Sequence, residues 1–479
     1  MIKSVGRVLA AIAVGVSLAG CNDFFDLQPT NEMVLDDFWK SEDDVKSVTS
    51  SCYRNMQESD FLKRVIVWGE FRSDNMLLSP SNGDDNLRYI ANLNLLPSNG
   101  YTSWGNFYNV INLCNTVEHF APGVRDEDPN FTQSQLNAYL AEVKGIRAYC
   151  YFTLVRAFRD VPFVTEPVID DTDTFEAPQA APDHIIDFLI DDLKAVEPRA
   201  AATYSNKTYT KSRMTQAAIR ALIADMCLWR GRYSECIEYC NRILRDANNV
   251  FTLVPSMSYS REVFTTGLSS ETIFELNYNT VNYWNYAVAD FYGEQSQGYA
   301  QQIIPYDFKT GVRQLFGETD LRERTSYYSN SGGGAIIRKY VSYLEGTALT
   351  ASNVSSGDYT RVSPYETKWI VYRLPEIYLM KAEAIVESGG DLQEAFRLAC
   401  ISYDRANPEA GAGSLSFDQF RNLVSTYLAV KYDNLDQSTV SSKLSSYDAL
   451  YMPINATEMR ANSLLVQNPF YKQSTDITN

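Results

Sequence analysis

The stretch IRALIADMCLWRGRYSECIEYCNRIL, residues 219–244, indicates two helices joined by a short turn at Gly231. Ala224 and Cys236 are small and fall where two antiparallel helices would approach closely, and Tyr233 opens the second helix. This pattern of small and large apolar positions is typical of tetratricopeptide-like repeats. An isolated αα-hairpin that turns at a glycine would show the same pattern. The stretch therefore predicts helix-on-helix packing.

A second helix pair is predicted by YRLPEIYLMKAEAIVESGGDLQEAFRLACISYDRA, residues 372–406. Ala382, Gly389 and Ala395 take places comparable to the small positions of the first pair, with one more residue in the turn. Two pairs with matched small positions favour repeats over an isolated hairpin, although neither copy is complete. We therefore expect a mainly α-helical fold that contains tetratricopeptide-like helix pairs.

Apolar residues recur at helical spacing elsewhere in the first half of the chain. Ser41 and Asp44 form a capping-box pattern before the first of these tracts. A dense apolar tract is predicted to end at the turn before Pro162. The expected helices cover residues 41–56, 106–120, 136–158, 183–196 and 212–230.

Residues 246–367 differ in character, because they are rich in Tyr, Ser, Asn, Gly and Thr and have weak periodicity. Long loops with short strands and small helices are expected there, and such insertions commonly carry binding sites. The predicted segments are a signal peptide (1–20), a tether (21–40), a helical scaffold with loop insertions (41–245), a loop-rich ligand-binding region (246–367), a helix pair (368–408) and an irregular C-terminal region packed on the scaffold (409–479).

The N-terminus has the pattern of an export signal that ends at a cysteine. Lys3 and Arg7 precede a short apolar core, which is too short to span a bilayer stably. Leu18-Ala19-Gly20-Cys21 resembles a bacterial lipobox, in which lipid is added to the cysteine and the chain is cut before it. The alternative is an ordinary cleaved signal with an incidental cysteine. We expect lipidation at Cys21 and attachment to a membrane surface.

Charge and cysteine content limit the classes of function. The formal net charge of −17 argues against binding to nucleic acid. The other cysteines are odd in number, have no CxxC spacing and fall where a helix would bury a small side chain. Core thiols are expected, and one disulfide stays possible. These cysteines are Cys52, Cys114, Cys150, Cys227, Cys236, Cys240 and Cys400.

Patterns of catalytic residues are weak. His119 and His184 are the only two histidines, and both fall in or beside helical tracts, so a histidine metal site or a serine triad is not indicated. SGGGAII at 331–337 lacks the lysine of a phosphate loop. The acidic run at 170–176 suits a solvated turn better than a calcium loop. We expect no catalysis, metal or cofactor, although a surface glycosidase with a carboxylate pair stays open.

Aromatic residues are the strongest sign of a binding site. The chain has 32 tyrosines, and VNYWNYAVADFYGEQSQGY at 281–299 concentrates aromatic rings without a helical stripe. Rings beside Asn282, Asn285 and Gln295 suit stacking on sugars with hydrogen bonds to hydroxyl groups, and they would equally hold a peptide. Burial of the rings under a loop is the alternative. The rings are Tyr283, Trp284, Tyr286, Phe291, Tyr292 and Tyr299.

Six stretches, taken in order, resemble the SusD/RagB family of Bacteroidetes outer-membrane nutrient-binding lipoproteins. They are spread over the whole chain after Cys21. Each stretch alone is a modest match to the family, but the six together are specific for it. They are FFDLQPTNEMVLDDFWKSEDDV (24–45), WGEFRSDNM (68–76), AEVKGIRAYCYFTLVRAFRDVPFVTEPV (141–168), SSETIFELNYN (269–279), YRLPEIYLMKAEA (372–384) and MPINATEMRANSLLVQNPFY (452–471).

The resemblance implies a non-catalytic binding lipoprotein on the outer membrane that faces the cell exterior. It implies four tetratricopeptide-like helix pairs that cradle a loop-rich ligand face. It also implies a SusC/RagA-like TonB-dependent barrel as partner, for which the protein is the lid. The ligand would be an oligosaccharide, which we favour, or an oligopeptide as in a RagAB-like importer. Asp23 and Asp26 fit the acidic export signal of such lipoproteins.

The resemblance also places the ligand site by region. The loops after the RSDN-like motif and a later aromatic loop contribute ligand contacts in the family. These regions map onto Arg72, Asn75 and Tyr89, and onto Tyr283, Trp284, Tyr286 and Tyr292. The resemblance further implies structural roles for four tryptophans, which we therefore expect in the core, namely Trp39, Trp104, Trp229 and Trp369.

Overall fold

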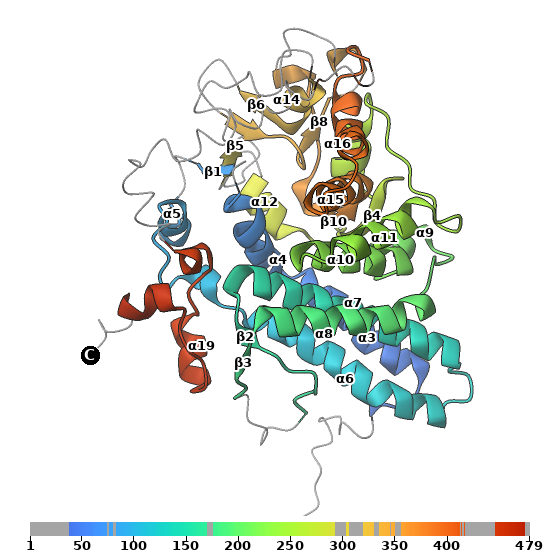
Figure 1. The fold of residues 1–479 in the computed structure, drawn as a ribbon, viewed down its shortest axis with the longest axis vertical. Coiled ribbons are helices and arrows are strands. Elements are labelled where there is room, and N and C mark those ends of the chain that lie inside the picture. The colour runs from blue at the N-terminus through green and yellow to red at the C-terminus, as the bar shows by residue number, and fades with distance from the viewer. Residues whose placement is uncertain are drawn as a thin grey trace, which may run out of the picture.

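The computed structural model describes residues 38–73, 76–79, 83–169, 176–292, 303–305, 320–329, 335–344, 346–349, 356–411, 413, 416 and 446–474. Helices make up most of this part of the chain, which confirms the predicted mainly α-helical class (Figure 1). Across the described segments, no helix is both long enough and apolar enough to cross a bilayer.

Four long helices lie side by side in the lower half of Figure 1. They are α3 (Glu42–Met56), α6 (Gly105–Glu127), α7 (Gln133–Phe158) and α8 (Pro182–Val196). Helix α7 is buried along most of its second half, because it packs on all three of the others. Its start is fixed by the capping box of Thr132 and Gln135.

The two predicted helix pairs are present and pack on each other. Helix α10 (Gln216–Trp229) pairs with α11 (Tyr233–Leu244), and α15 (Leu374–Glu387) pairs with α16 (Leu392–Ala406), while α11 also packs on α15. Gly231 and Gly389 have φ of +70° and +69°, a region that glycine occupies without steric cost. The prediction of tetratricopeptide-like helix pairs is therefore confirmed for these helices.

Shorter elements connect the long helices. The short α-helices are α4 (Ser59–Val65), α5 (Asp85–Ala91), α9 (Lys207–Ser212), α12 (Tyr286–Tyr292), α14 (Leu321–Ser326) and α19 (Ala456–Ala461). Turns of π-helix form η2 (Ile66–Phe71) and η5 (Ser260–Thr266). Turns of 3-10 helix form η3 (Gly100–Thr102), η4 (Glu197–Arg199), η7 (Gly346–Leu349), η8 (Ser356–Asp358), η9 (Pro364–Glu366), η10 (Tyr447–Leu450) and η11 (Pro469–Ser474).

Described strands pair two at a time and antiparallel. The central pair joins β10 to β4, with Trp369 opposite Leu276, and β4 is buried along its length. The pairs are β1 (Met76–Leu78) with β5 (Ile303–Pro305), β2 (Val161–Pro162) with β3 (Gln179–Ala180), β4 (Thr272–Leu276) with β10 (Trp369–Arg373), β6 (Tyr327–Ser329) with β7 (Ala335–Ile337), and β8 (Ser342–Tyr343) with β9 (Thr360–Arg361).

Several helix boundaries differ from the prediction. The helix expected over 106–120 continues through Pro122 and ends at Glu127. The helix expected over 212–230 begins at Gln216, because the Thr215 hydroxyl caps it by accepting the Ala218 N–H at 3.4 Å. All the cysteines described in the structure are buried as free thiols, which agrees with their interpretation as core residues.

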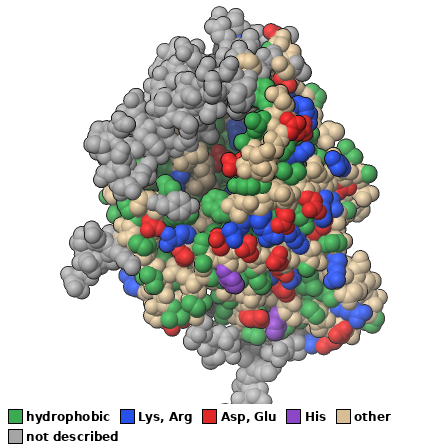
Figure 2. Space-filling view, viewed as in Figure 1, with side chains coloured by type: hydrophobic (Ala, Val, Ile, Leu, Met, Phe, Trp, Pro, Cys, Tyr) green, Lys and Arg blue, Asp and Glu red, His purple; other side chains and the backbone are tan. Residues whose placement is uncertain are grey.

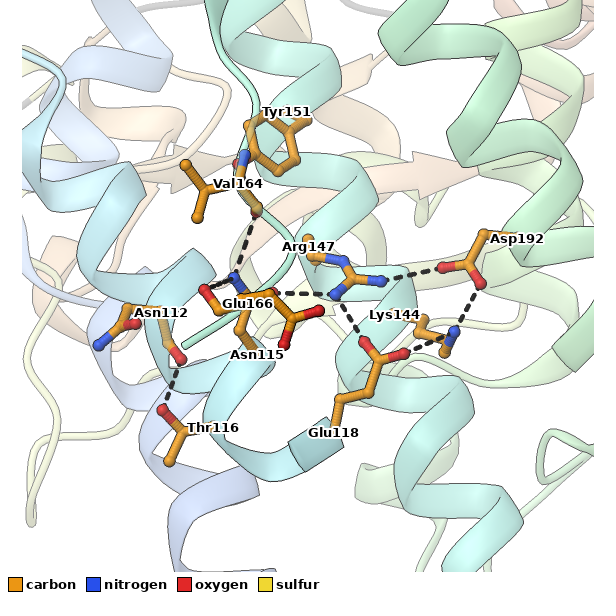
Figure 3. Close-up of polar contacts among 10 residues, drawn as sticks. All are labelled: Asn112, Asn115, Thr116, Glu118, Lys144, Arg147, Tyr151, Val164, Glu166 and Asp192. Atoms are coloured by element: carbon orange, nitrogen blue, oxygen red, sulfur yellow. Dashed lines mark hydrogen bonds and ion pairs between the residues drawn. The ribbon is translucent and has the colours of Figure 1, made fainter. Parts of the chain in front are cut away.

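A network of charged side chains joins α6, α7 and α8 (Figure 3). The buried Arg147 guanidinium donates to Asn115 Oδ1 at 2.9 Å, to Glu118 Oε2 at 2.5 Å and to Asp192 Oδ2 at 3.0 Å. Lys144 Nζ contacts the same two carboxylates at 2.8 Å and 2.5 Å. Lys144 and Arg147 therefore each pair with both Glu118 and Asp192. We call these four residues and Asn115 the Arg147 network.

Candidate functional site

Three neighbouring aromatic side chains are exposed where a loop leads into the start of α12. Tyr283, Trp284 and Tyr286 are 36%, 42% and 51% exposed. The Trp284 and Tyr286 rings lie 6.0 Å apart between centroids and 27° from parallel. The half-buried Tyr365 of η9 lies 5.1 Å from Trp284 and 5.5 Å from Tyr286. We call these four residues the aromatic platform, and they form the candidate site.

Hydrogen bonds within the loop fix the platform. Asn279 and Tyr283 exchange backbone hydrogen bonds at 2.8 Å and 3.1 Å, which closes a tight turn. Inside the turn, Asn279 Oδ1 accepts the N–H groups of Val281 at 3.0 Å and Asn282 at 2.9 Å. Trp284 Nε1 donates to the Thr280 carbonyl at 2.7 Å. The loop backbone and the Trp284 ring are thus held by hydrogen bonds within the loop, which reduces the entropy that binding would cost.

Asn285 attaches the loop to the rest of the protein. Its N–H donates to the Tyr365 carbonyl at 2.8 Å, and its Nδ2 donates to the Thr367 carbonyl at 2.8 Å. Its Oδ1 accepts the Val288 N–H at 3.0 Å, which caps α12. The prediction that Asn285 would offer hydrogen bonds to a ligand is wrong, because the side chain is 1% exposed and fully used inside the protein.

Replacing Asn285 by alanine is expected to loosen the platform. The change leaves the Thr367 carbonyl and the Val288 N–H without partners, which costs about 1–3 kcal/mol of unfolding free energy. Urea denaturation would measure this cost. Asn282→Ala removes the exposed amide three positions earlier and should leave the unfolding midpoint nearly unchanged. Equal midpoints for the two variants would contradict the anchoring role of Asn285.

Polar groups border the platform. The Arg54 guanidinium of α3 lies 4.6 Å from the centre of the Tyr283 ring, a cation–π distance. Arg54 is paired with Glu58 at 2.9 Å, and the Thr280 hydroxyl donates to Glu366 at 2.5 Å. Flat rings surrounded by a guanidinium and carboxylates suit a ligand that carries both apolar faces and hydroxyl or amide groups.

The other predicted site residues are not part of the platform. Arg72 follows η2, and its Nη2 donates to the Leu450 carbonyl at 2.5 Å, so it contacts the C-terminal segment. Tyr89 is on α5 and is 43% exposed. Asn75 and Cys21 lie outside the described residues.

The structure contradicts the prediction that Tyr292 contacts the ligand. This residue is fully buried, and its ring packs 5.0 Å from Tyr340 and 6.5 Å from Trp369. Tyr292 is therefore a core residue. Phe291 is also buried, at 1% exposed. For Tyr292 and Phe291, burial is therefore observed in place of the exposure that stacking on a ligand would need.

Of the four tryptophans expected in the core, three are buried and one is exposed. Trp39, Trp104 and Trp369 are buried, as the resemblance implied. Trp229 is 46% exposed at the end of α10, and its ring centroid lies 6.1 Å from that of Phe152, so its assignment to the core is wrong. Tyr365 was not predicted from the sequence, because about 80 residues separate it from the loop that it contacts.

The fold and the platform together define a scaffold of helix pairs with an exposed aromatic surface of the kind used to bind ligands. The SusD family model matches residues 197–403. SusD-like protein P38 of Formosa agariphila is 23% identical over 436 residues, which cover 85% of this chain and 83% of that protein. The family model, the SusD-like relatives and the structures described as SusD superfamily proteins together support the SusD/RagB family for this chain.

Solved structures share the fold. A structure described as a laminarin binding SusD-like protein covers 90% of this chain and 99% of its own, with a TM-score of 0.64 and 19% identity. Surface glycan-binding protein A from Bacteroides uniformis covers 90% of this chain and 100% of its own, with a TM-score of 0.67 and 19% identity. At this identity the likeness concerns the fold.

Proposed function

We propose that this protein captures glycan at the cell surface and delivers it to a partner TonB-dependent outer-membrane barrel, for which it is the lid. The observation that carries the proposal is the aromatic platform, in which Tyr283, Trp284 and Tyr286 are exposed together on a loop held by its own hydrogen bonds. Proteins of the same fold that are described as laminarin-binding and glycan-binding support glycan as the ligand class.

The proposed mechanism needs binding but no chemistry. Sugar rings would stack on the platform through their apolar faces, while their hydroxyl groups would reach the polar side chains around it. Because hydrogen bonds hold the loop of the platform, binding would cost little ordering entropy. The barrel would complete the enclosure around the captured glycan. On this proposal the protein is not an enzyme and uses no cofactor.

Isothermal titration tests the proposal. The protein without residues 1–21 would be titrated with a panel of neutral oligosaccharides and with mixed oligopeptides. Saturable binding of an oligosaccharide, without turnover, is the expected result. Binding of peptides alone would replace glycan capture by the function of an oligopeptide importer. Hydrolysis of the bound ligand during the titration would overturn the binding role.

Lipidation at Cys21 is a separate part of the proposal. We expect Cys21→Ser to move the protein from the outer-membrane fraction to the soluble fraction of cells. The physical reason is that each buried methylene of an acyl chain contributes ~0.8 kcal/mol, and two chains give stable anchoring. Fractionation and mass measurement of the mature N-terminus would check this result. Retention of the variant in the membrane fraction would contradict anchoring through Cys21.

A further inference from the structure

A cavity of about 300 Å³ lies where η2, α7, α10, β10 and α15 meet. We call it the junction cavity. Its volume is at the lower end of the range for small-molecule sites. Figure 2 shows this face of the molecule hollowed near its middle, with acidic and basic side chains inside the hollow. The lining residues that matter here are Glu70, Arg156, Asp225, Trp369, Tyr372 and Glu376.

Most of the charged groups in the junction cavity already have partners. Asp225 Oδ2 accepts the Tyr372 hydroxyl at 2.8 Å and lies 3.9 Å from Arg156 Nη1. Glu70 Oε1 lies 3.9 Å from Lys339 Nζ. Within the described part of the chain, Glu376 has no hydrogen bond or ion pair, although it lies in the cavity wall. A bound ligand would therefore find one carboxyl group without a partner.

The chemistry of the lining favours a ligand that donates hydrogen bonds and is positively charged. Three carboxyl groups line the cavity against one guanidinium, and carboxylates only accept hydrogen bonds. The Arg156 guanidinium already faces Asp225, and it lies 4.4 Å from the centre of the Phe152 ring. Aromatic side chains also line the cavity, among them Trp369 and Tyr372. Carboxylates beside aromatic rings are the groups that recognise ammonium ions.

The pKa of Glu376 makes its carboxyl group sensitive to a nearby cation. Burial raises the pKa of Glu376 to about 8, and the negative charges of Asp225 and Glu70 act in the same direction. Arg373 and Arg156 lower the pKa of Glu376 but do not compensate. A cation bound beside Glu376 would favour its carboxylate form, so binding of the cation would release a proton below pH 8.

We propose that the junction cavity binds the primary ammonium group of a small ligand, with Glu376 and Asp225 as its hydrogen-bond acceptors. Two ligand sources share this chemistry, namely an amino sugar and an amino acid. The site is separate from the aromatic platform, because the side chains that line it belong to other elements. The proposal therefore does not depend on the proposed function.

The first test uses the unaltered protein without residues 1–21. Nα-acetyl-L-lysine, whose one amine is a side-chain ammonium that stays charged to about pH 10, would be titrated against Nα-acetyl-L-norleucine, which has no amine, and D-glucosamine against D-glucose. We expect one or both amines to bind and their counterparts not to bind. If the lysine derivative binds, its affinity should be about tenfold higher at pH 9 than at pH 7, because the Glu376 carboxyl is mostly ionised only at the higher pH.

The second test removes the proposed acceptor. Glu376→Gln is expected to abolish amine binding, while Glu387→Gln removes an equivalent charge from the exposed end of α15 and should have no effect. Trp284→Ala should leave amine binding unchanged, which separates this site from the platform. Equal binding of the uncharged counterparts, no binding of either amine, or full binding by Glu376→Gln would overturn the proposal.

Discussion

Replacing Trp284 by alanine is expected to weaken oligosaccharide binding by about 10- to 100-fold, or about 1.4 to 2.8 kcal/mol. Trp284 is the ring of the aromatic platform that lies next to both Tyr286 and Tyr365. Its removal takes away a stacking surface and also leaves its neighbours without lateral support. Isothermal titration of the protein without residues 1–21 would measure the change, with the oligosaccharide that binds the unaltered protein most tightly.

Trp229→Ala is the matched control, because Trp229 is exposed to a similar extent, 46% against 42%, at the end of α10. This variant should bind the oligosaccharide as the unaltered protein does. Urea denaturation should show that Trp284→Ala remains folded, since the ring is largely outside the core. Unchanged affinity in Trp284→Ala would show that the platform is not the glycan site.

The helix pairs could be predicted from the sequence because the relevant signals are local. A helix that packs on a neighbour repeats its apolar residues at about 3.6-residue spacing, and the turns need a glycine at positive φ, as at Gly231 and Gly389. Boundaries were less accurate. The end of the helix beyond Pro122 depends on its packing against α7, which spacing within one helix does not report.

The candidate site was only partly predictable, for a geometric reason. The aromatic cluster at 281–299 has no helical stripe as a whole, yet its middle part forms α12 (Tyr286–Tyr292). At about 100° per residue, Tyr286 and Phe291 point in directions about 140° apart. Tyr286 is therefore exposed while Phe291 is buried. The contact with Tyr365 is set by Asn285 and the loop before β10, so no local pattern predicts it.

Replacing Arg147 by methionine is expected to lower the free energy of unfolding by about 3 kcal/mol or more. Arg147 is 2% exposed, and it is the residue of the Arg147 network that bonds to Glu118 on α6 and Asp192 on α8 (Figure 3). Methionine fills most of the same space but leaves both carboxylates with Lys144 as their remaining basic partner in the network. Removing one partner from a buried ion pair typically costs about 3–5 kcal/mol.

Urea denaturation followed by circular dichroism would measure this loss as a lower midpoint. Arg125→Met is the matched control, because Arg125 lies on α6 and pairs at 3.0 Å with Asp126 while 43% exposed. An exposed ion pair contributes about 0–1 kcal/mol to the free energy of unfolding, so the urea midpoint of Arg125→Met should barely change. The difference between the two variants isolates the effect of burying the charge. Similar midpoints would mean that the packing of α6, α7 and α8 holds these helices together without the network.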